Sequence, residues 1–301
     1  MSEKLIANAS ALKSGNRWRL SRRRFLAAGA PLVLAAKNAL ADRTHGEFLQ
    51  SSTELKAQKL AWAGVKLEIP SMTLFIDPLI SHEVWGDALK QPIVPVESAT
   101  IRRQVLITHL HNDHFDEAAV KKILAEGGNL ICHIESAAIA ASRGFRVRAA
   151  KLYEPMLFGD FTITAVPAAD GYGDDQVSWI VTGGGRKIIH CGDTMWHGSY
   201  WKIGRQHGPF DAAFLPINGA KFSWLKPQSD IPAVLTPEQA VAAGVVLGAR
   251  LAVPIHYGVS GAASYEEQAN AEAAFIEIAR KHNLSVEVAK PGEWLKWKAN
   301  A

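Results

Sequence analysis

Residues 108–116 read Thr-His-Leu-His-Asn-Asp-His-Phe-Asp. The whole chain has 11 histidines, and three of them fall in this stretch, at His109, His111 and His114. Asp113 lies among them, and the preceding residues 104–107 read Gln-Val-Leu-Ile, a short aliphatic run that predicts a buried strand. The cluster would therefore lie where a strand ends and a loop begins, which is a common place for ligand-binding side chains.

The composition is that of an ordinary globular protein, long enough to bury a core in one domain or in two tightly joined halves. Of its 301 residues, 48% are apolar and 21% are charged. The formal net charge of +4 is local, because residues 1–41 hold eight of the 33 Lys and Arg but one of the 29 acidic residues. Residues 42–301 consequently carry 25 basic and 28 acidic side chains. That balance gives no support to a nucleic-acid-binding surface.

The basic leader is similar to a twin-arginine export signal. Residues 21–26 read Ser-Arg-Arg-Arg-Phe-Leu, an apolar run follows, and Ala-Leu-Ala at 39–41 suits signal peptidase. The alternative is an uncleaved membrane anchor, but the run contains Pro31 and is far shorter than the roughly 20 residues that span a bilayer. We therefore expect a signal peptide at 1–41, a hydrolytic domain at 42–301, and export by the twin-arginine translocase to the periplasm.

Strand and helix patterns alternate along the mature chain. Apolar runs bounded by turn residues predict strands at 60–69, 72–78, 161–166, 177–182, 187–191, 250–254 and 285–289. Helical patterns predict helices at 117–126, 236–247 and 265–281, the first with Asp116 as its cap. The two cysteines, Cys132 and Cys191, lie in apolar runs and are expected to be buried thiols. Two sheets with helices outside them are the natural layering of such a chain.

Other polar residues also follow predicted strands. They are Asp77, Asp170, Asp193 and His256. Because loops converge at one edge of a layered α/β fold, these side chains are candidates for a shared site with the histidine cluster. Imidazole and carboxylate ligands suit Zn²⁺, Mn²⁺ or Fe²⁺, and the lack of a cysteine cluster argues against a structural zinc site.

Three motifs together resemble the metallo-β-lactamase superfamily. They are His109-x-His111-x-Asp113-His114, Gly192-Asp193-Thr194 and Pro254-Ile255-His256. Within that superfamily the similarity is greatest to the ascorbate-phosphate lactonase-like and phospholipase D-like hydrolases, and it covers nearly all of residues 58–300. The resemblance implies an α/β fold in the form of a four-layer αββα sandwich, with two metal ions at one edge.

The resemblance also implies a role for each motif residue. His109 and His111 would bind the first metal, and Asp113, His114 and His256 the second. Asp193 would bridge the two ions, and Asp77 would orient the histidine loop without binding metal. A hydroxide between the ions would attack the substrate, with Asp113 also managing the proton.

The chain departs from the family pattern at two positions. Relatives usually carry a histidine where Asp170 stands, so a carboxylate would complete the first site and favour Mn²⁺ or Fe²⁺. Asp174 or Asp175 could be the ligand instead, or the first site could be half-empty and the enzyme work with one metal. Relatives often carry Gly-His where this chain has Gly64-Val65, so that histidine is absent here.

Four further residues are candidates near the substrate, namely His197, Asn218, Trp196 and Trp224. His197 follows the Asp193 motif and could contact the substrate, whereas His190 fits a packing role better. Asn218 could donate a hydrogen bond to a substrate oxygen, or it could be a turn residue. Trp196 and Trp224 could wall an apolar pocket or belong to the core.

Three functions remain open at this level. The first is a hydrolase of lactones, esters or amides that uses two divalent ions, Zn²⁺ or Mn²⁺, with Fe²⁺ as a further candidate. The second is a phosphodiesterase of the phospholipase D-like type, and the third is a non-enzymatic metal- or partner-binding domain. A small molecule is the expected substrate, and self-association into a homo-oligomer is left open.

Overall fold

The computed structural model describes residues 54–125 and 127–297. All described residues belong to the second of the two units into which the chain divides, residues 50–301. The expected signal peptide and its cleavage site lie outside the described residues. Within the described part of the chain, no helix has both the length and the apolar character needed to cross a membrane.

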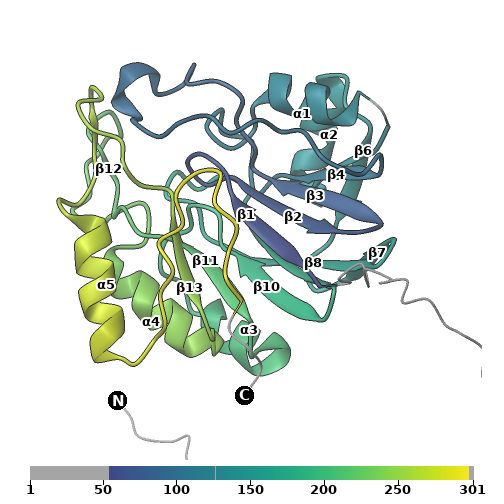
Figure 1. Cartoon of the computed structure of the whole chain (residues 1–301). Helices are drawn as coiled ribbons and strands as arrows, with labels where there is room; N and C mark the ends of the chain where they lie inside the picture. The colour runs from purple at the N-terminus through teal and green to yellow at the C-terminus, as the bar shows by residue number, and fades with distance from the viewer. Residues whose placement is uncertain (1–53, 126, 298–301) are drawn as a thin grey trace, which may run out of the picture. The chain divides into compact units, whose positions relative to one another are not determined.

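Two six-stranded sheets form the centre of the second unit (Figure 1). The first sheet runs, in spatial order, β1 (Lys56–Lys59), β2 (Val65–Ile69), β3 (Met72–Ile76), β4 (Arg103–Leu106), β5 (Leu130–His133) and β6 (Val147–Ala150). The second runs β13 (Ala252–Ile255), β11 (Ala212–Pro216), β10 (Arg186–His190), β9 (Val177–Gly183), β8 (Phe161–Pro167) and β7 (Pro155–Phe158). A separate two-stranded ribbon pairs β12 (Lys221–Phe222) with β14 (Tyr265–Glu266).

Helices cover the outer face of each sheet, as Figure 1 shows. Against the first sheet lie α1 (Glu117–Leu124) and α2 (Ile134–Ser142). Against the second sheet lie α3 (Ser199–His207), α4 (Pro237–Leu247) and α5 (Ala271–Lys281). A short 3₁₀ helix, η1, spans Gly86–Ala88 in the loop between β3 and β4. The order helix, sheet, sheet, helix confirms the predicted four-layer αββα sandwich.

Alternation along the central strands divides their side chains between two neighbouring cores. In β3, Leu74 and Ile76 belong to the core between the sheets, whereas Phe75 belongs to the core under α1 and α2. In β11, Phe214 faces the core between the sheets and Leu215 faces the core under α3, α4 and α5. Successive strand residues point to opposite faces, so a continuous apolar strand fills two cores at once.

Helix starts follow the predicted caps. The Asp116 carboxylate accepts the backbone N–H of Ala119 at 2.9 Å and so caps α1. At α4, the Thr236 side chain accepts the N–H of Gln239, whose own side chain accepts the N–H of Thr236. These side-chain hydrogen bonds satisfy backbone N–H groups that the first helical turn leaves unpaired.

Two predicted elements near the C-terminus were wrong. The helix expected from residue 265 begins at Ala271, because Asn270 has a left-handed backbone (φ 56°) and residues 265–266 pair as β14. The strand expected at 285–289 is reduced to one bridge between Val286 and Ala252. In both places pairing with a distant segment decides the local conformation, which a local pattern does not report.

The strands that precede the candidate residues end at one edge of the sandwich. β3 and β4 are parallel, and so are β10, β11 and β13. β8 runs antiparallel to β9, which runs antiparallel to β10, so β8 also points toward that edge. The residues that follow β3, β4, β8, β10 and β13 are therefore brought together.

Candidate metal centre

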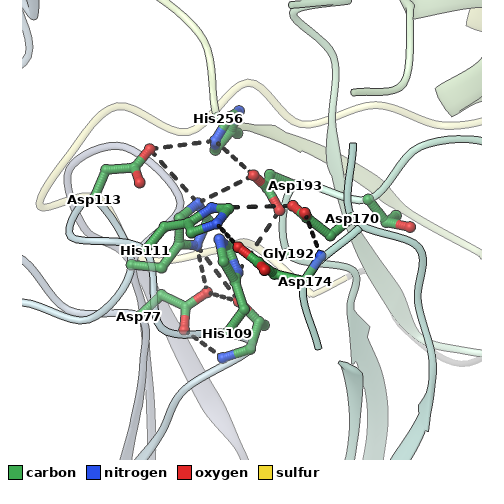
Figure 2. A network of polar contacts seen from close by, with 12 residues as sticks. Asp77, His109, His111, Asp113, Asp170, Asp174, Gly192, Asp193 and His256 are labelled. Atoms are coloured by element: carbon green, nitrogen blue, oxygen red, sulfur yellow. Dashed lines mark hydrogen bonds and ion pairs between the residues drawn. The ribbon is translucent and has the colours of Figure 1, made fainter. Parts of the chain in front are cut away.

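Seven side chains that follow four strands, β4, β8, β10 and β13, meet at this edge, and Figure 2 shows several of them gathered around Asp193. We call His109, His111 and Asp170 the first half of the centre, and Asp113, His114 and His256 the second half. His109, His111, Asp170 and Asp193 each offer a ligand atom within 4.8 Å of the others, and so do His114, Asp193 and His256. These are the seven residues that the sequence singled out as metal ligands. Their ligation of metal stays a prediction.

The distances within the second half are those of ligands around a common ion. His114 Nε2 lies 3.9 Å from both Asp113 Oδ2 and Asp193 Oδ2, and His256 Nε2 lies 3.8 Å from the same two oxygens. These separations are too long for hydrogen bonds. They suit atoms that each lie about 2.0–2.2 Å from one cation.

Buried ligand atoms without partners support the same interpretation. His109 Nε2, His114 Nε2, His256 Nε2 and Asp193 Oδ1 are all buried and make no hydrogen bond. A buried polar atom without a partner is costly, and most such atoms in proteins are satisfied. Divalent cations coordinated by these atoms would satisfy them, so the residues present fit a metal centre.

Asp77 supports the second half from behind. Its Oδ1 accepts the backbone N–H of Thr108 at 2.8 Å, and its Oδ2 accepts the Thr108 hydroxyl at 2.6 Å. The same Oδ2 lies 2.8 Å from His114 Nδ1, which assigns the proton to Nδ1 and leaves Nε2 directed at Asp193. Burial alone would raise the pKa of Asp77, but the hydrogen bond and charge of His114 bring it below its ordinary value.

Trp62 is a second support that sequence reasoning missed. Its indole Nε1–H donates to Asp113 Oδ2 at 3.2 Å, and its ring packs on His256 with 4.1 Å between centroids. The Trp62 carbonyl also accepts the backbone N–H of His256. Trp62 is fully buried with a left-handed backbone (φ 56°), and its carbonyl accepts a further bond from the buried Lys59 ammonium. The only sequence signal was its place three residues before Val65, where relatives often carry a histidine.

Asp170 lies in the first half and has two separate roles. Its Oδ1 is 4.0 Å from His111 Nδ1, facing the other ligands. Its Oδ2 accepts the backbone N–H groups of Tyr172 at 2.7 Å and Asp174 at 3.0 Å, which holds the loop that follows. Asp174 Oδ2 in turn lies 2.9 Å from His111 Nε2, on the far side of that ring, whereas Asp175 is exposed and outside the cluster.

Burial and neighbouring charge shift the pKa values of two histidines of the centre in opposite directions. Burial lowers the pKa of His109 to about 4, so its ring is neutral at pH 7. Burial alone would also lower the pKa of His114, but the carboxylates of Asp113, Asp193 and Asp77 raise it to about 9. A cation at His114 Nε2 therefore has to displace a proton.

His190 has the packing role that the sequence favoured. Burial lowers the pKa of its ring to about 4, which makes it neutral. Nε2–H then donates to the Ala63 carbonyl at 2.8 Å, and Nδ1 accepts the backbone N–H of Gly192 at 3.2 Å. The ring ties the Asp193 loop to the segment that carries Trp62.

A cavity of about 430 Å³ opens onto the centre. Its floor is the metal cluster and its walls are mainly aromatic and apolar. The wall residues are Val84, Trp85, Gly171, Tyr172, Asp174, Phe222, Trp224, Ala233, Val234 and Tyr265. Among the described residues that line it, none is Lys or Arg.

Three of the four candidate substrate contacts do not line this cavity. His197 stacks on Tyr200, with 4.1 Å between ring centroids. Trp196 packs edge-on against Trp201 on α3. The Asn218 amide is buried and donates to the Tyr265 hydroxyl at 2.6 Å, so it supports a wall residue. Trp224 does line the cavity, which is one of the two positions left open for it.

Comparison with known proteins agrees with the fold and the cluster. The family described as the β-lactamase superfamily domain matches residues 73–257, more than half of the chain. The chain belongs to this superfamily. A metal-dependent hydrolase from Rubrobacter xylanophilus is 29% identical over 206 residues, covering 64% of this chain and 77% of that protein. Another from Thermus thermophilus is 30% identical over 200 residues, covering 64% of this chain and 80% of its own.

A solved structure shows the same fold. Igni18, a metallo hydrolase from Ignicoccus hospitalis, aligns with a TM-score of 0.62 at 20% identity, covering 82% of this chain and 99% of its own. The predicted metallo-β-lactamase fold is confirmed. The protein is a metal-dependent hydrolase of the β-lactamase superfamily.

Proposed function

We propose that the protein hydrolyses an uncharged carboxylic ester, lactone or amide with two divalent ions bound at the centre. The observation that carries this proposal is the cavity itself. It joins the cluster of ligand atoms to aromatic walls, and its charged lining groups are the carboxylates of Asp113, Asp170, Asp174 and Asp193. An uncharged carbonyl compound fits such a cavity without leaving a charge unpaired.

The phosphodiesterase alternative is less well supported by the lining. Bound divalent ions would meet the negative charge of a phosphodiester at the centre, so the walls decide the comparison. Proteins usually add Arg or Lys side chains around such an anion. The described lining supplies neither, and the exposed carboxylate of Asp174 would repel an anion. We therefore favour the lactonase-like chemistry over the phospholipase D-like chemistry within the superfamily.

The bound ions, Asp113 and the aromatic walls have different roles in the proposed reaction. Bound divalent ions supply Lewis-acid polarisation and lower the pKa of water. The Asp113 carboxylate lines the cavity, and the hydrogen bond from Trp62 fixes the position of its Oδ2. The carboxylate is therefore placed to hold a proton beside the reacting carbonyl. Aromatic walls exclude bulk water and strengthen the electrostatic interactions within the cavity.

Asp170 bears on the identity of the metals. A carboxylate in place of a third imidazole adds negative charge and a harder ligand to the first half. We propose Mn²⁺ or Fe²⁺ in at least that half, with Zn²⁺ as the competitor. Elemental analysis of protein purified without added metal checks this, and zinc alone at two equivalents would contradict it.

A substrate panel tests the bond type. The metal-loaded protein should hydrolyse 4-nitrophenyl acetate and a γ-lactone at rates that depend on metal, and it should leave bis-(4-nitrophenyl) phosphate largely intact. Chelation followed by return of the metal is the control for contaminating esterases. Faster cleavage of the phosphodiester than of either carbonyl compound would contradict the proposal.

We also propose periplasmic export through the twin-arginine route, on the leader sequence alone. Replacing Arg22 and Arg23 with Lys should leave the precursor in the cytoplasm. Fractionation of cells that express the full chain measures this. Export of the double variant at the ordinary rate would overturn the proposal.

A further inference from the structure

Three aromatic rings form one continuous wall of the cavity. Phe222 lies between the other two, with ring centroids 4.9 Å from Tyr172 and 4.7 Å from Trp224. Tyr172 and Trp224 are themselves 6.0 Å apart. The planes of the three rings differ by 30–37°, so the rings pack partly face to face and not as crossed edges. We call Tyr172, Phe222 and Trp224 the aromatic wall.

The aromatic wall leaves apolar surface exposed beside the metal centre. Tyr172 is 40% exposed and Trp224 is 46% exposed, although both are large aromatic side chains. Exposed apolar surface that borders a cavity is typical of a ligand-binding site. The wall also reaches the ligands, because the Tyr172 ring lies 5.2 Å from the His111 ring.

The loop that presents Tyr172 is built into the first half of the centre. Asp170 accepts the Tyr172 N–H, and Gly171 lies so close to Ala233 that a Cβ atom there would come within 2.3 Å of the Ala233 side chain. A larger residue at 171 would push the loop away. Tyr172 is therefore held against the ribbon segment that carries Phe222 and Trp224.

Charge at the wall argues against an anionic ligand group. Asp174 is an exposed lining carboxylate, and its one contact with His111 Nε2, at 2.9 Å, leaves its negative charge in place. It would therefore repel an anion. Within the described lining there is also no Lys or Arg to pair with one.

From these observations, and resting on the proposed function, we infer that the substrate carries a flat, uncharged apolar group, such as an aromatic ring, that binds against the aromatic wall. This group would lie beside the bond that is hydrolysed. The wall thus determines specificity, whereas the metal centre supplies the chemistry. Substrates with an anionic substituent on that group would be rejected, because its charge would be desolvated without a partner.

Binding of hydroxamates to the metal-loaded protein tests the inference without requiring turnover. Acetohydroxamate, benzohydroxamate and 4-carboxybenzohydroxamate share one metal-chelating head and differ only in the attached group. Burial of a phenyl ring should make benzohydroxamate bind about tenfold more tightly than acetohydroxamate. The carboxylated compound should lose that advantage. Titration calorimetry measures all three dissociation constants.

A matched pair of variants locates the effect. Trp224→Ala should reduce the phenyl advantage to below about threefold and leave acetohydroxamate binding unchanged. Trp201→Ala is the control, because Trp201 is also 46% exposed but lies on α3 and does not line the cavity. Tyr172→Ala, from a different segment of the wall, should behave as Trp224→Ala does.

Failures of the two proposals are distinguishable. No phenyl advantage in the unmodified protein, or equal losses in the Trp224 and Trp201 variants, would overturn the aromatic subsite even if esters are hydrolysed. A phenyl preference in a protein that hydrolyses no ester, lactone or amide would keep the subsite and remove the proposed function.

Discussion

Each half of the metal centre contains a histidine whose outer nitrogen contacts a carboxylate, and the two contacts have nearly the same length. His114 Nδ1 lies 2.8 Å from Asp77, and His111 Nε2 lies 2.9 Å from Asp174. The surroundings differ, however. His114 and Asp77 are both 0% exposed, whereas His111 is 27% exposed and Asp174 is 67% exposed.

This difference shows that contact distance alone does not say which of the two carboxylate–histidine contacts stabilises its half of the centre more. Water screens an exposed pair, which typically contributes little, whereas breaking a buried pair leaves a charge without a partner. Trp62 further supports the second half through Asp113 and His256. We therefore expect the second half to hold its ion tightly and the first half to hold its ion weakly and to be tuned by its loop.

Removing the predicted bridging ligand should have the largest effect. Asp193→Ala takes away the carboxylate that we expect to contact both ions, which would leave two cations facing each other without a bridge. Loss of a residue that merely orients a ligand costs about 10–100-fold in metal affinity, so this change should cost more than about 100-fold. Metal content after dialysis and hydrolytic rate should fall together. Two ions retained in the variant would show that Asp193 is not the bridge.

The next largest effect should come from the buried support. Asp77→Asn presents an amide N–H₂ group where Oδ2 accepts bonds from Thr108 and His114. We expect the tighter ion to be held about 10–100-fold more weakly, with the weaker ion nearly unaffected. Competition with a fluorescent chelator resolves the two affinities. An equal loss of affinity for both ions would contradict the idea that Asp77 supports the second half alone.

Trp62→Phe tests the other support of the second half. It keeps the ring that packs on His256 and removes the N–H that holds Asp113, so the tighter ion should be held about tenfold more weakly. Trp179→Phe is the matched control, because Trp179 is also fully buried and its Nε1 makes no hydrogen bond. Similar metal affinity in the two variants would exclude a positioning role for the indole N–H.

Asp170→His tests the departure from the family pattern. Imidazole at this position should raise zinc occupancy relative to manganese or iron and lower the pH at which the rate rises. The structure adds a cost, because histidine cannot accept both the Tyr172 and Asp174 N–H groups, and losing a part-buried hydrogen bond costs about 0.5–1.5 kcal/mol.

Asp170→Asn separates these two effects. Its amide oxygen can still accept the loop N–H groups, so stability should be kept while the metal preference changes. Metal content, pH profile and thermal unfolding of both variants are the measurements. If both match the unmodified protein in metal content and pH profile, Asp170 is not a ligand.

The smallest effect should come from the exposed support. Asp174→Asn alters a contact with His111 that is open to solvent, so metal affinity should change by no more than about fivefold. The same chelator competition compares it directly with Asp77→Asn. A loss as large as that of Asp77→Asn would mean that burial does not separate the two halves.

The sequence by itself determined the layering and the seven candidate ligands. Apolar strand patterns, the caps at Asp116 and Thr236, and polar residues placed directly after strands are local signals, because strand periodicity and helix capping depend on neighbouring residues. Parallel strand ends lie at one edge, so residues at five such ends could be grouped before their contacts were known.

Only the tertiary structure decided what surrounds those ligands. The Trp62–Asp113 bond, the Asp174–His111 contact and the Asn218–Tyr265 bond each join segments far apart in the chain. Such pairings depend on how two sheets pack and where loops cross, and no local periodicity records them. For the same reason the sequence left Trp196 and His197 open between substrate contact and packing, whereas in the structure both pack around Tyr200.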